Sequence, residues 1–295
     1  MKPLFNISGF LILLYDLLVC TSFAQTEFNT TLMNSTYKIY GVDKIDSNKI
    51  NIGTCFIVGK QVSNDSNFYS FVLVTAKHVL DGINNDFAFL ELRLKDSINF
   101  YDKVPFKIKI KNNGIPIWNE LKDSSIDIAA MFIPLPEKFV DQFSTSFLPM
   151  SFLSNDSIFE SIEIHPGDNL FCLGYPAGIS SNDFGFPVLR SGLISSYPLF
   201  PSTNIKSFLL DTEVYQGNSG GPVYLYQQSR VIEMNNVFKT FATIVGILTQ
   251  QILYPDELIV SDSITLKENK PLKLAKVIPA HFIRQVINTL PEVLK

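Results

Sequence analysis

The sequence predicts an all-β protein folded as a barrel or a sandwich. Ten short apolar runs, rich in β-branched and aromatic residues, follow one another along the chain and are separated by Gly, Pro, Asn, Asp and Ser. The first reads KINIGTCFIVG and begins at Lys49, and the last reads TFATIVGILTQ and begins at Thr240. Short apolar runs bounded by turn residues in this way are typical of antiparallel strands.

Helical periodicity is clear only near the end of the chain. Pro279 is suited to a helix start, and apolar residues then recur at helical spacing at Phe282, Ile283, Val286, Ile287 and Leu290. We therefore expect one C-terminal helix that packs its apolar face on the β-structure.

Composition limits the class of protein. The chain has 295 residues, of which 46% are hydrophobic and 18% charged, and it is therefore long enough to bury one large core or two modest ones. The formal net charge is −4, and the Lys and Arg residues are scattered along the chain. This pattern argues against a nucleic-acid-binding surface.

The first residues, MKPLFNISGFLILLYDLLVCTSFAQ, have the pattern of a secretory signal peptide. One lysine precedes an apolar run that is too short for a membrane span and is interrupted by Asp16, and the run ends in the small residues Ser22 and Ala24. We expect residues 1–24 to be removed and the protein to be secreted or periplasmic. A buried N-terminal helix and a lipid anchor on Cys20 are the two alternatives.

The remaining chain is expected to form two β halves, residues 25–150 and 151–295, that meet in the Pro/Ser/Asp-rich stretch from Pro134 to Asp156. Each half contains one cysteine, Cys55 or Cys172, within an apolar run. A disulfide is permitted in an exported protein, but the apolar surroundings favour two buried thiols.

The stretch YQGNSGGPVY, from Tyr215 to Tyr224, is the most informative local pattern. Three glycines and a proline surround Ser219 immediately before an apolar run. Glycine is useful where a turn needs positive φ or a close backbone approach. The pattern predicts a shaped turn that presents the Ser219 hydroxyl and aims the N–H groups of Gly217 and Ser219 at one point, as an oxyanion hole requires.

A serine nucleophile needs a histidine base, and the chain has three histidines. His165 lies in a loop before a proline and His281 in the terminal helix, whereas His78 directly follows the apolar run FVLVTA. We therefore select His78.

The acid that orients this base is expected at the start of a buried segment. Asp127 opens the apolar run DIAAMFI, whereas its neighbour Asp123 lies in a polar stretch, and burial therefore favours Asp127. A Ser-His-Asp triad needs neither a metal nor a cofactor, and we predict none.

The order His78, Asp127, Ser219 is one of the few in which serine hydrolases carry these residues. The blocks TAKHVL, DIAAM and GNSGGPV resemble those around the histidine, aspartate and serine of trypsin-like, or chymotrypsin-fold, serine peptidases. The segments GTCFIVG, GDNLFCLGYPAG, SGLIS and IVGI resemble, more loosely, strands of the bacterial and HtrA-like members.

This resemblance implies two packed six-stranded antiparallel β-barrels, with His78 and Asp127 in the first and Ser219 in the second. It also implies an exported serine endopeptidase that forms an acyl-enzyme with protein or peptide substrates. The residues after IVGI are expected to form a strand pair and the closing helix, and we therefore expect no PDZ domain. Two other readings remain: an idle barrel that serves as a binding or scaffold module, and an esterase on another fold.

Two further residues are assigned from the resemblance. Glu213, six positions before Ser219, is expected at the base of the substrate pocket, where its carboxylate would favour Lys or Arg; Asp211 is its competitor. Asn218 occupies the position at which animal enzymes carry an aspartate that receives a freed N-terminal ammonium. Because an amide carries no charge, we expect no activating cleavage in the similar segment KIYGV at Lys38.

Overall fold

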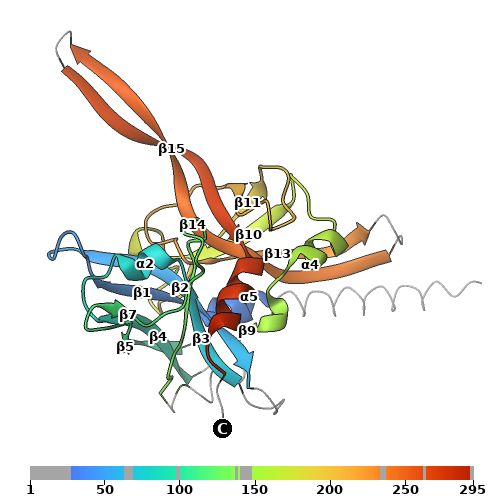
Figure 1. The fold of residues 1–295 in the computed structure, drawn as a ribbon, viewed down its shortest axis with the longest axis horizontal. Coiled ribbons are helices and arrows are strands. Elements are labelled where there is room, and N and C mark those ends of the chain that lie inside the picture. Colours follow the sequence, from blue (N-terminus) through green and yellow to red (C-terminus); the bar gives the residue numbers. More distant parts are fainter. Residues whose placement is uncertain are drawn as a thin grey trace, which may run out of the picture.

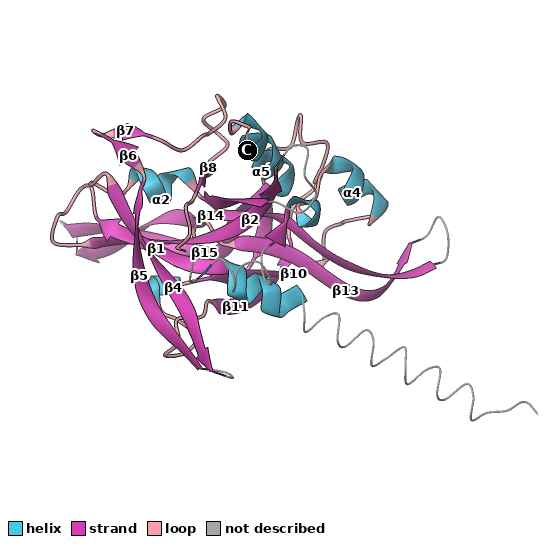
Figure 2. Cartoon of the chain, turned by 90° about the horizontal axis from the view of Figure 1, so that it is seen from below, coloured by secondary structure: helices cyan, strands magenta, loops and turns pink. Residues whose placement is uncertain are grey.

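The computed structural model describes residues 28–62, 69–97, 100–136, 139, 148–232, 237–261 and 264–292. The predicted signal peptide, including Cys20, lies outside these residues. Strands form almost all of the body, and the helices are short pieces at its periphery (Figure 2). Among the described residues, no helix combines the length and the apolar character that crossing a membrane requires.

The first part of the chain forms one antiparallel sheet with a single short parallel addition. Its elements are β1 (Thr36–Val42), β2 (Ile50–Gln61), β3 (Tyr69–Thr75), α2 (Lys77–Asp81), β4 (Phe87–Ser97), β5 (Phe100–Lys109), β8 (Ala129–Phe132) and β9 (Leu148–Pro149). The strand order is β5-β4-β1-β2-β3-β8, and β9 pairs with β2. The small strands β6 (Lys111–Asn112) and β7 (Ile115–Pro116) form a separate hairpin.

The second part forms a closed barrel. Its elements are η1 (Met150–Phe152), α4 (Asp156–Ser161), β10 (Asn169–Gly174), η2 (Pro176–Gly178), β11 (Val188–Ile194), β12 (Phe208–Asp211), β13 (Pro222–Ile232), β14 (Val237–Ser261), β15 (Ile264–Pro279) and α5 (Ala280–Thr289). The barrel order is β10-β11-β12-β15-β14-β13.

The all-β class and the C-terminal helix are confirmed, and the second barrel has the six strands expected of it. The first sheet differs in one respect, because β5 and β8 at its two ends do not pair with each other. The outer edge of β8 is occupied instead by Asn119, whose backbone exchanges two hydrogen bonds with Ala130, at 2.8 and 3.0 Å. This bridge uses the backbone N–H and C=O of Ala130, with which a strand that closed the sheet into a barrel would have to pair.

The two halves share one apolar core. This core joins Phe56 and Val58 of the first sheet, Tyr224 of the barrel and the buried face of α5, including Val286. Each sheet also has a separate core of its own. Because the shared core lies between the sheets, it fixes how the rim of one meets the rim of the other. The exact limit at residue 150 stays a prediction.

Two features complete the fold. Cys55 and Cys172 are buried free thiols, which confirms the preference for thiols over a disulfide. The distal parts of β14 and β15, which pair from Leu253 with Pro271 to Ser261 with Ile264, project from the body as a two-stranded ribbon (Figure 1). A strand pair is expected there from the sequence, but not one that leaves the barrel.

Candidate active site

His78 is held at the rim of the first sheet by the short helix α2. This helix begins directly after β3, and its residues Val79 and Leu80 are buried beneath the sheet edge. Gly53 of β2 makes room for Val79, since a Cβ at Gly53 would lie 2.4 Å from a methyl group of Val79. With its neighbours facing inward, the His78 side chain faces outward and is 49% exposed.

Asp127 meets His78 at two points. Its Oδ2 lies 2.6 Å from His78 Nδ1, and its Oδ1 accepts a hydrogen bond of 2.9 Å from the His78 backbone N–H. The flanking residues Ile126 and Ile128 are buried and anchor the segment just before β8. Because an ionised carboxylate only accepts hydrogen bonds, His78 carries a proton on Nδ1, and Nε2 is the acceptor whenever the ring is neutral.

The electrostatics of Asp127 follow from this contact. Burial is the largest single influence and raises the pKa of the Asp127 carboxyl, but the hydrogen bonds from the ring and backbone of His78, together with the charges of His78 and Lys276, hold the pKa below its ordinary value. Asp123, the competing acid, accepts hydrogen bonds from Lys206 and Ser125 instead. The structure therefore brings Asp127, and not Asp123, to His78.

Ser219 lies on a tight turn that glycine makes possible. The Asn218 N–H donates to Tyr215 O at 3.0 Å, and the Gly221 N–H donates to Asn218 O at 3.1 Å. Gly217 and Gly220 have φ of +97° and +91°, in the left-handed region that other residues seldom adopt. A Cβ at Gly217 would also lie 2.2 Å from Tyr175 O.

This turn packs directly against the first sheet. The Thr54 N–H of β2 donates to Ser219 O at 2.8 Å. A Cβ at Gly220 would lie 2.0 Å from Thr54 O, 2.3 Å from Thr75 Oγ1 and 3.1 Å from Ala76 N. Ala76 is two residues before His78, and the serine turn therefore meets the chain at the point from which the histidine is presented.

The Ser219 hydroxyl has a different partner in this structure. It donates to Thr249 O of β14 at 3.0 Å. Among the described residues, no hydrogen bond joins it to the ring of His78. The structure thus brings His78 and Asp127 into contact and brings the Ser219 turn beside them, while the serine–histidine hydrogen bond itself is not formed.

A hydrogen bond fixes the orientation of the Gln216–Gly217 peptide in the serine turn. Gln216 O accepts a hydrogen bond of 2.7 Å from the Ala177 N–H, and the N–H of Gly217, on the other side of this trans peptide, points the opposite way. Within the described part of the chain, neither the Gly217 N–H nor the Ser219 N–H donates to a protein acceptor. Two donors on one turn are left available to a ligand.

Glu213 lies between β12 and the serine turn and is partly buried. Its hydrogen bond with Tyr215 is the main cause that raises the pKa of the Tyr215 hydroxyl, and Arg190 lies 5.5 Å from the Tyr215 ring centroid. Asp211, at the end of β12, is exposed. Glu213 therefore has Tyr215 as its hydrogen-bond partner, and its role in a substrate pocket stays a prediction.

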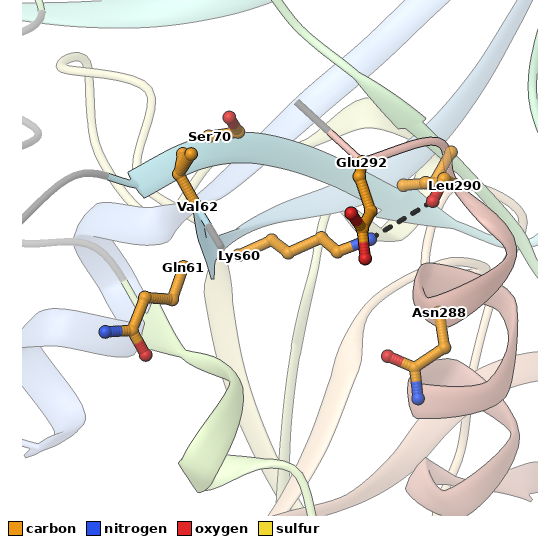
Figure 3. A pocket seen from close by; sticks show the side chains of 7 residues that line it. All are labelled: Lys60, Gln61, Val62, Ser70, Asn288, Leu290 and Glu292. Atoms are coloured by element: carbon orange, nitrogen blue, oxygen red, sulfur yellow. Dashed lines mark hydrogen bonds between the residues drawn. The ribbon is translucent and has the colours of Figure 1, made fainter. Parts of the chain in front are cut away.

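The other two histidines lie elsewhere. The side chain of His165 is 62% exposed beside Asp168, and His281 on α5 contacts Gln285. A separate pocket of about 280 Å³ is lined by Lys60, Gln61, Val62, Ser70, Asn288, Leu290 and Glu292 (Figure 3). Lys60 donates there to the carbonyl oxygens of Ile287 and Leu290 at the end of α5, both at 3.2 Å. None of the candidate catalytic residues lines this pocket.

Sequence reasoning missed several residues that hold the site. Thr54, Tyr175 and Thr249 all contact the serine turn; Thr54 and Tyr175 lie in segments that resemble the family only loosely, and Thr249 lies in the apolar run TFATIVGILTQ. Nothing in the chemistry of these threonine and tyrosine side chains identifies them in the sequence as part of an active site. The glycines next to Tyr175 were the one available indication of a close backbone approach.

A family model of the trypsin-like peptidase domain matches residues 53–232, which include His78, Asp127 and Ser219. No curated protein matches the chain.

Three of the solved structures that are similar to the chain are proteases. An HtrA-type protease, AlgW, solved with a tripeptide, has a TM-score of 0.48 at 17% identity; the match covers 90% of this chain and 62% of AlgW. The Rv3671c protease from M. tuberculosis in its active form has a TM-score of 0.47 at 16% identity, with 90% and 85% covered. The protease Anisep from Arthrobacter nicotinovorans has a TM-score of 0.48 at 15% identity, with 88% and 96% covered.

Proposed function

Because the chain belongs to the trypsin-like peptidases, we propose that it is a serine endopeptidase in which Ser219 is the nucleophile, His78 the general base and Asp127 the orienting acid. The observation that carries this proposal is the pairing of His78 Nδ1 with Asp127 Oδ2 at 2.6 Å, beside a glycine turn that presents Ser219. The substrates would be proteins or peptides.

The proposed reaction proceeds through an acyl-enzyme. The Ser219 hydroxyl would first rotate from Thr249 O toward His78 Nε2. Ser219 Oγ then attacks the scissile carbonyl while His78 Nε2 takes its proton and passes it to the leaving amine. Water hydrolyses the ester in the second half of the reaction, with His78 again acting as base.

The two available N–H groups would stabilise the transition state. The N–H groups of Gly217 and Ser219 would bind the oxygen of the tetrahedral intermediate, where negative charge develops. The Ala177 N–H holds the Gln216 carbonyl at 2.7 Å and so sets the orientation of the peptide that carries the Gly217 N–H. Asp127, ionised at neutral pH, would stabilise the imidazolium that His78 becomes.

We also propose that this peptidase is active without cleavage at Lys38. Ile39, the residue that such cleavage would free, is fully buried in β1 and pairs with Gly53 and Leu90. Cutting before it would divide a central strand. Asn218 is itself buried, and as a neutral amide it offers no carboxylate to a freed ammonium. Activity that appears only after cleavage between Lys38 and Ile39 would contradict this proposal.

Export remains part of the proposal on sequence grounds. Residues 1–24 would direct secretion or transfer to the periplasm, with a cut after Ala24. N-terminal sequencing of the mature protein tests this directly. A mature chain that begins with a lipidated Cys20 would indicate the anchor instead, and an intact Met1 would indicate a retained N-terminal helix.

The experiment that separates a peptidase from an idle barrel is covalent labelling. A fluorophosphonate should label the purified protein, and the label should be absent from Ser219→Ala and strongly reduced in His78→Ala. Labelling of Ser219 together with cleavage of a peptide library would support the endopeptidase. A folded wild-type protein that neither reacts nor cleaves would favour a scaffold module.

A further inference from the structure

Arg93 is a buried cation that the proposed chemistry does not use. It lies on β4 and is only 3% exposed. Its Nη2 donates to three backbone oxygens, Met33 O at 2.9 Å, Asn34 O at 3.0 Å and Thr36 O at 2.9 Å. These carbonyls belong to the helical segment 28–35 and the start of β1. Arg93 therefore fixes the N-terminal segment through its backbone.

Aromatic rings hold the guanidinium of Arg93 in place. Its central carbon lies 4.3 Å from the ring centroid of Tyr37 and 4.4 Å from that of Phe186. A planar guanidinium stacked on aromatic rings has its donors fixed in direction, which a lysine ammonium on a flexible stem does not reproduce. The site is thus built for arginine.

The same guanidinium reaches toward the candidate active site through Tyr175. Arg93 Nη1 donates to Tyr175 Oη and to Gly185 O, both at 3.1 Å. The Tyr175 hydroxyl in turn donates to Gly185 O at 3.0 Å or Thr36 O at 3.2 Å. Burial raises the pKa of Tyr175, which therefore stays a neutral donor. Arg93 and Tyr175 share acceptors and orient each other.

The backbone of Tyr175 contacts the serine turn. Its N–H donates to Thr54 Oγ1 at 3.2 Å, and the Thr54 hydroxyl donates to Gly217 O at 2.7 Å. Its carbonyl oxygen lies so close to Gly217 that an added Cβ would be 2.2 Å away. Two residues later, the Ala177 N–H holds Gln216 O. The position of Tyr175 therefore decides where the Gln216–Gly217 peptide lies.

We propose that Arg93 is a positioning residue for the oxyanion-binding turn, acting through Tyr175 and anchored on the carbonyls of residues 33–36. This inference rests on the proposed peptidase function. It explains how a chain with Asn218 in place of an acidic residue orders this turn: an internal guanidinium joins the N-terminal segment to the turn by hydrogen bonds, and no new terminus has to be generated. The alternative is that Arg93 contributes to stability alone.

A matched pair of substitutions separates these two roles. Arg230 is also a buried arginine, 5% exposed, but it pairs with Asp168 at 2.9 and 3.0 Å, and none of its hydrogen bonds within the described residues reaches the serine turn. Arg93→Lys and Arg230→Lys each keep the charge and lose the planar fork, and both are expected to lower Tm. Only Arg93→Lys is expected to lower kcat, by about tenfold or more, with KM changed by less than about threefold.

A peptidyl boronic acid gives a second readout, because its tetrahedral adduct places a negative oxygen in the oxyanion hole. Its affinity is expected to fall with kcat in Arg93→Lys and to stay at the wild-type value in Arg230→Lys. Tyr175→Phe removes only the hydroxyl through which Arg93 acts and should give the same pattern to a smaller extent. This variant tests the link even if Arg93→Lys fails to fold.

The outcomes are distinct. Wild-type kcat and boronate affinity in folded Arg93→Lys and Tyr175→Phe would overturn the positioning role and leave the peptidase proposal intact. Equal losses of kcat in Arg93→Lys and Arg230→Lys at the same fraction folded would also overturn it. A wild-type protein that fluorophosphonate does not label would overturn the peptidase proposal itself, and the positioning role with it.

Discussion

His78 and Asp127 of the first sheet meet through their side chains, whereas the Ser219 turn of the second barrel is shaped by its backbone. The histidine is half exposed, and it contacts the less exposed Asp127 carboxylate directly at 2.6 Å. The turn is enclosed, and three of its neighbours, Thr54, Thr75 and Tyr175, lie within 2.3 Å of where a glycine Cβ would be.

This difference predicts which substitutions each half of the site tolerates. On the first sheet, a side chain can be altered without moving the backbone, so a substitution should affect chemistry far more than folding. On the serine turn, an added methyl group has no space, so a substitution should displace the turn and affect folding and chemistry together. Substitutions in both halves test this contrast, and the largest effect is expected on the serine turn.

Gly220→Ala is expected to have the largest effect. Its Cβ would meet Thr54 O at 2.0 Å, and its φ of +91° is unfavourable for alanine. Strain and overpacking together should cost about 3 kcal/mol or more of unfolding free energy and remove nearly all activity. Thermal denaturation and peptide cleavage measure the two effects.

Gly167→Ala is the matched control for this substitution. Gly167 has the same φ of +91°, but nothing lies within 4 Å of its added Cβ. Only backbone strain should remain, worth about 1 kcal/mol, and activity should be close to wild type. If both alanine variants behaved alike, the close approach of the turn to the first sheet would not be what fixes the turn.

Asp127→Asn should change chemistry with little change in folding. The amide can keep the shape of the carboxylate, but it no longer selects the Nδ1–H tautomer of His78 or stabilises the imidazolium. We expect kcat to fall by about 10⁴ while Tm stays near the wild-type value. Asp123→Asn, which alters the acid that contacts Lys206, should retain turnover. A loss of turnover in Asp123→Asn alone would reverse the assignment of the acid.

The pH dependence of stability gives a smaller effect on the same contact. Since the pKa of Asp127 is lowered by its contacts with His78, its ionised form stabilises the folded state above the unfolded pKa of about 3.9. This contribution should be lost as the pH falls through the lower folded pKa. The difference in unfolding free energy between wild type and Asp127→Asn should therefore narrow below about pH 4. Urea unfolding at a series of pH values measures it, and a difference that grew toward low pH would show that the carboxylate is not stabilised in the fold.

The parts of the site that the sequence predicted are those with local patterns. Ser219 lies among glycines that need positive φ, and His78 follows an apolar strand. The parts that it did not predict are contacts between distant residues. Thr54 and Gly217 are 163 positions apart, and Arg93 and Tyr175 are 82 apart, so no periodicity or spacing links them. The projecting ribbon was missed because paired strands that stay in a barrel and paired strands that leave it have the same alternation of residues.

Glu213 lies next to the serine turn, whose shape is set by its backbone. Its substitution is expected to give the smallest effect. If its carboxylate lies at the base of the substrate pocket, the enzyme should prefer to cleave after Lys or Arg, and Glu213→Ala should reduce that preference. The carboxylate already accepts a hydrogen bond from Tyr215, so the reduction should be about tenfold or less, with kcat for an apolar substrate unchanged.

A peptide-library digest with wild type, Glu213→Ala and the exposed control Asp211→Ala measures this preference. A loss in Glu213→Ala alone would place the charge of Glu213 in the pocket. A loss in Asp211→Ala alone would assign the pocket charge to Asp211. Cleavage after Val, Ala or Leu that neither substitution alters would mean that the pocket is apolar. Glu213 would then serve only to hold Tyr215 beside the serine turn, and specificity, like the position of Ser219, would depend on how the backbone is folded.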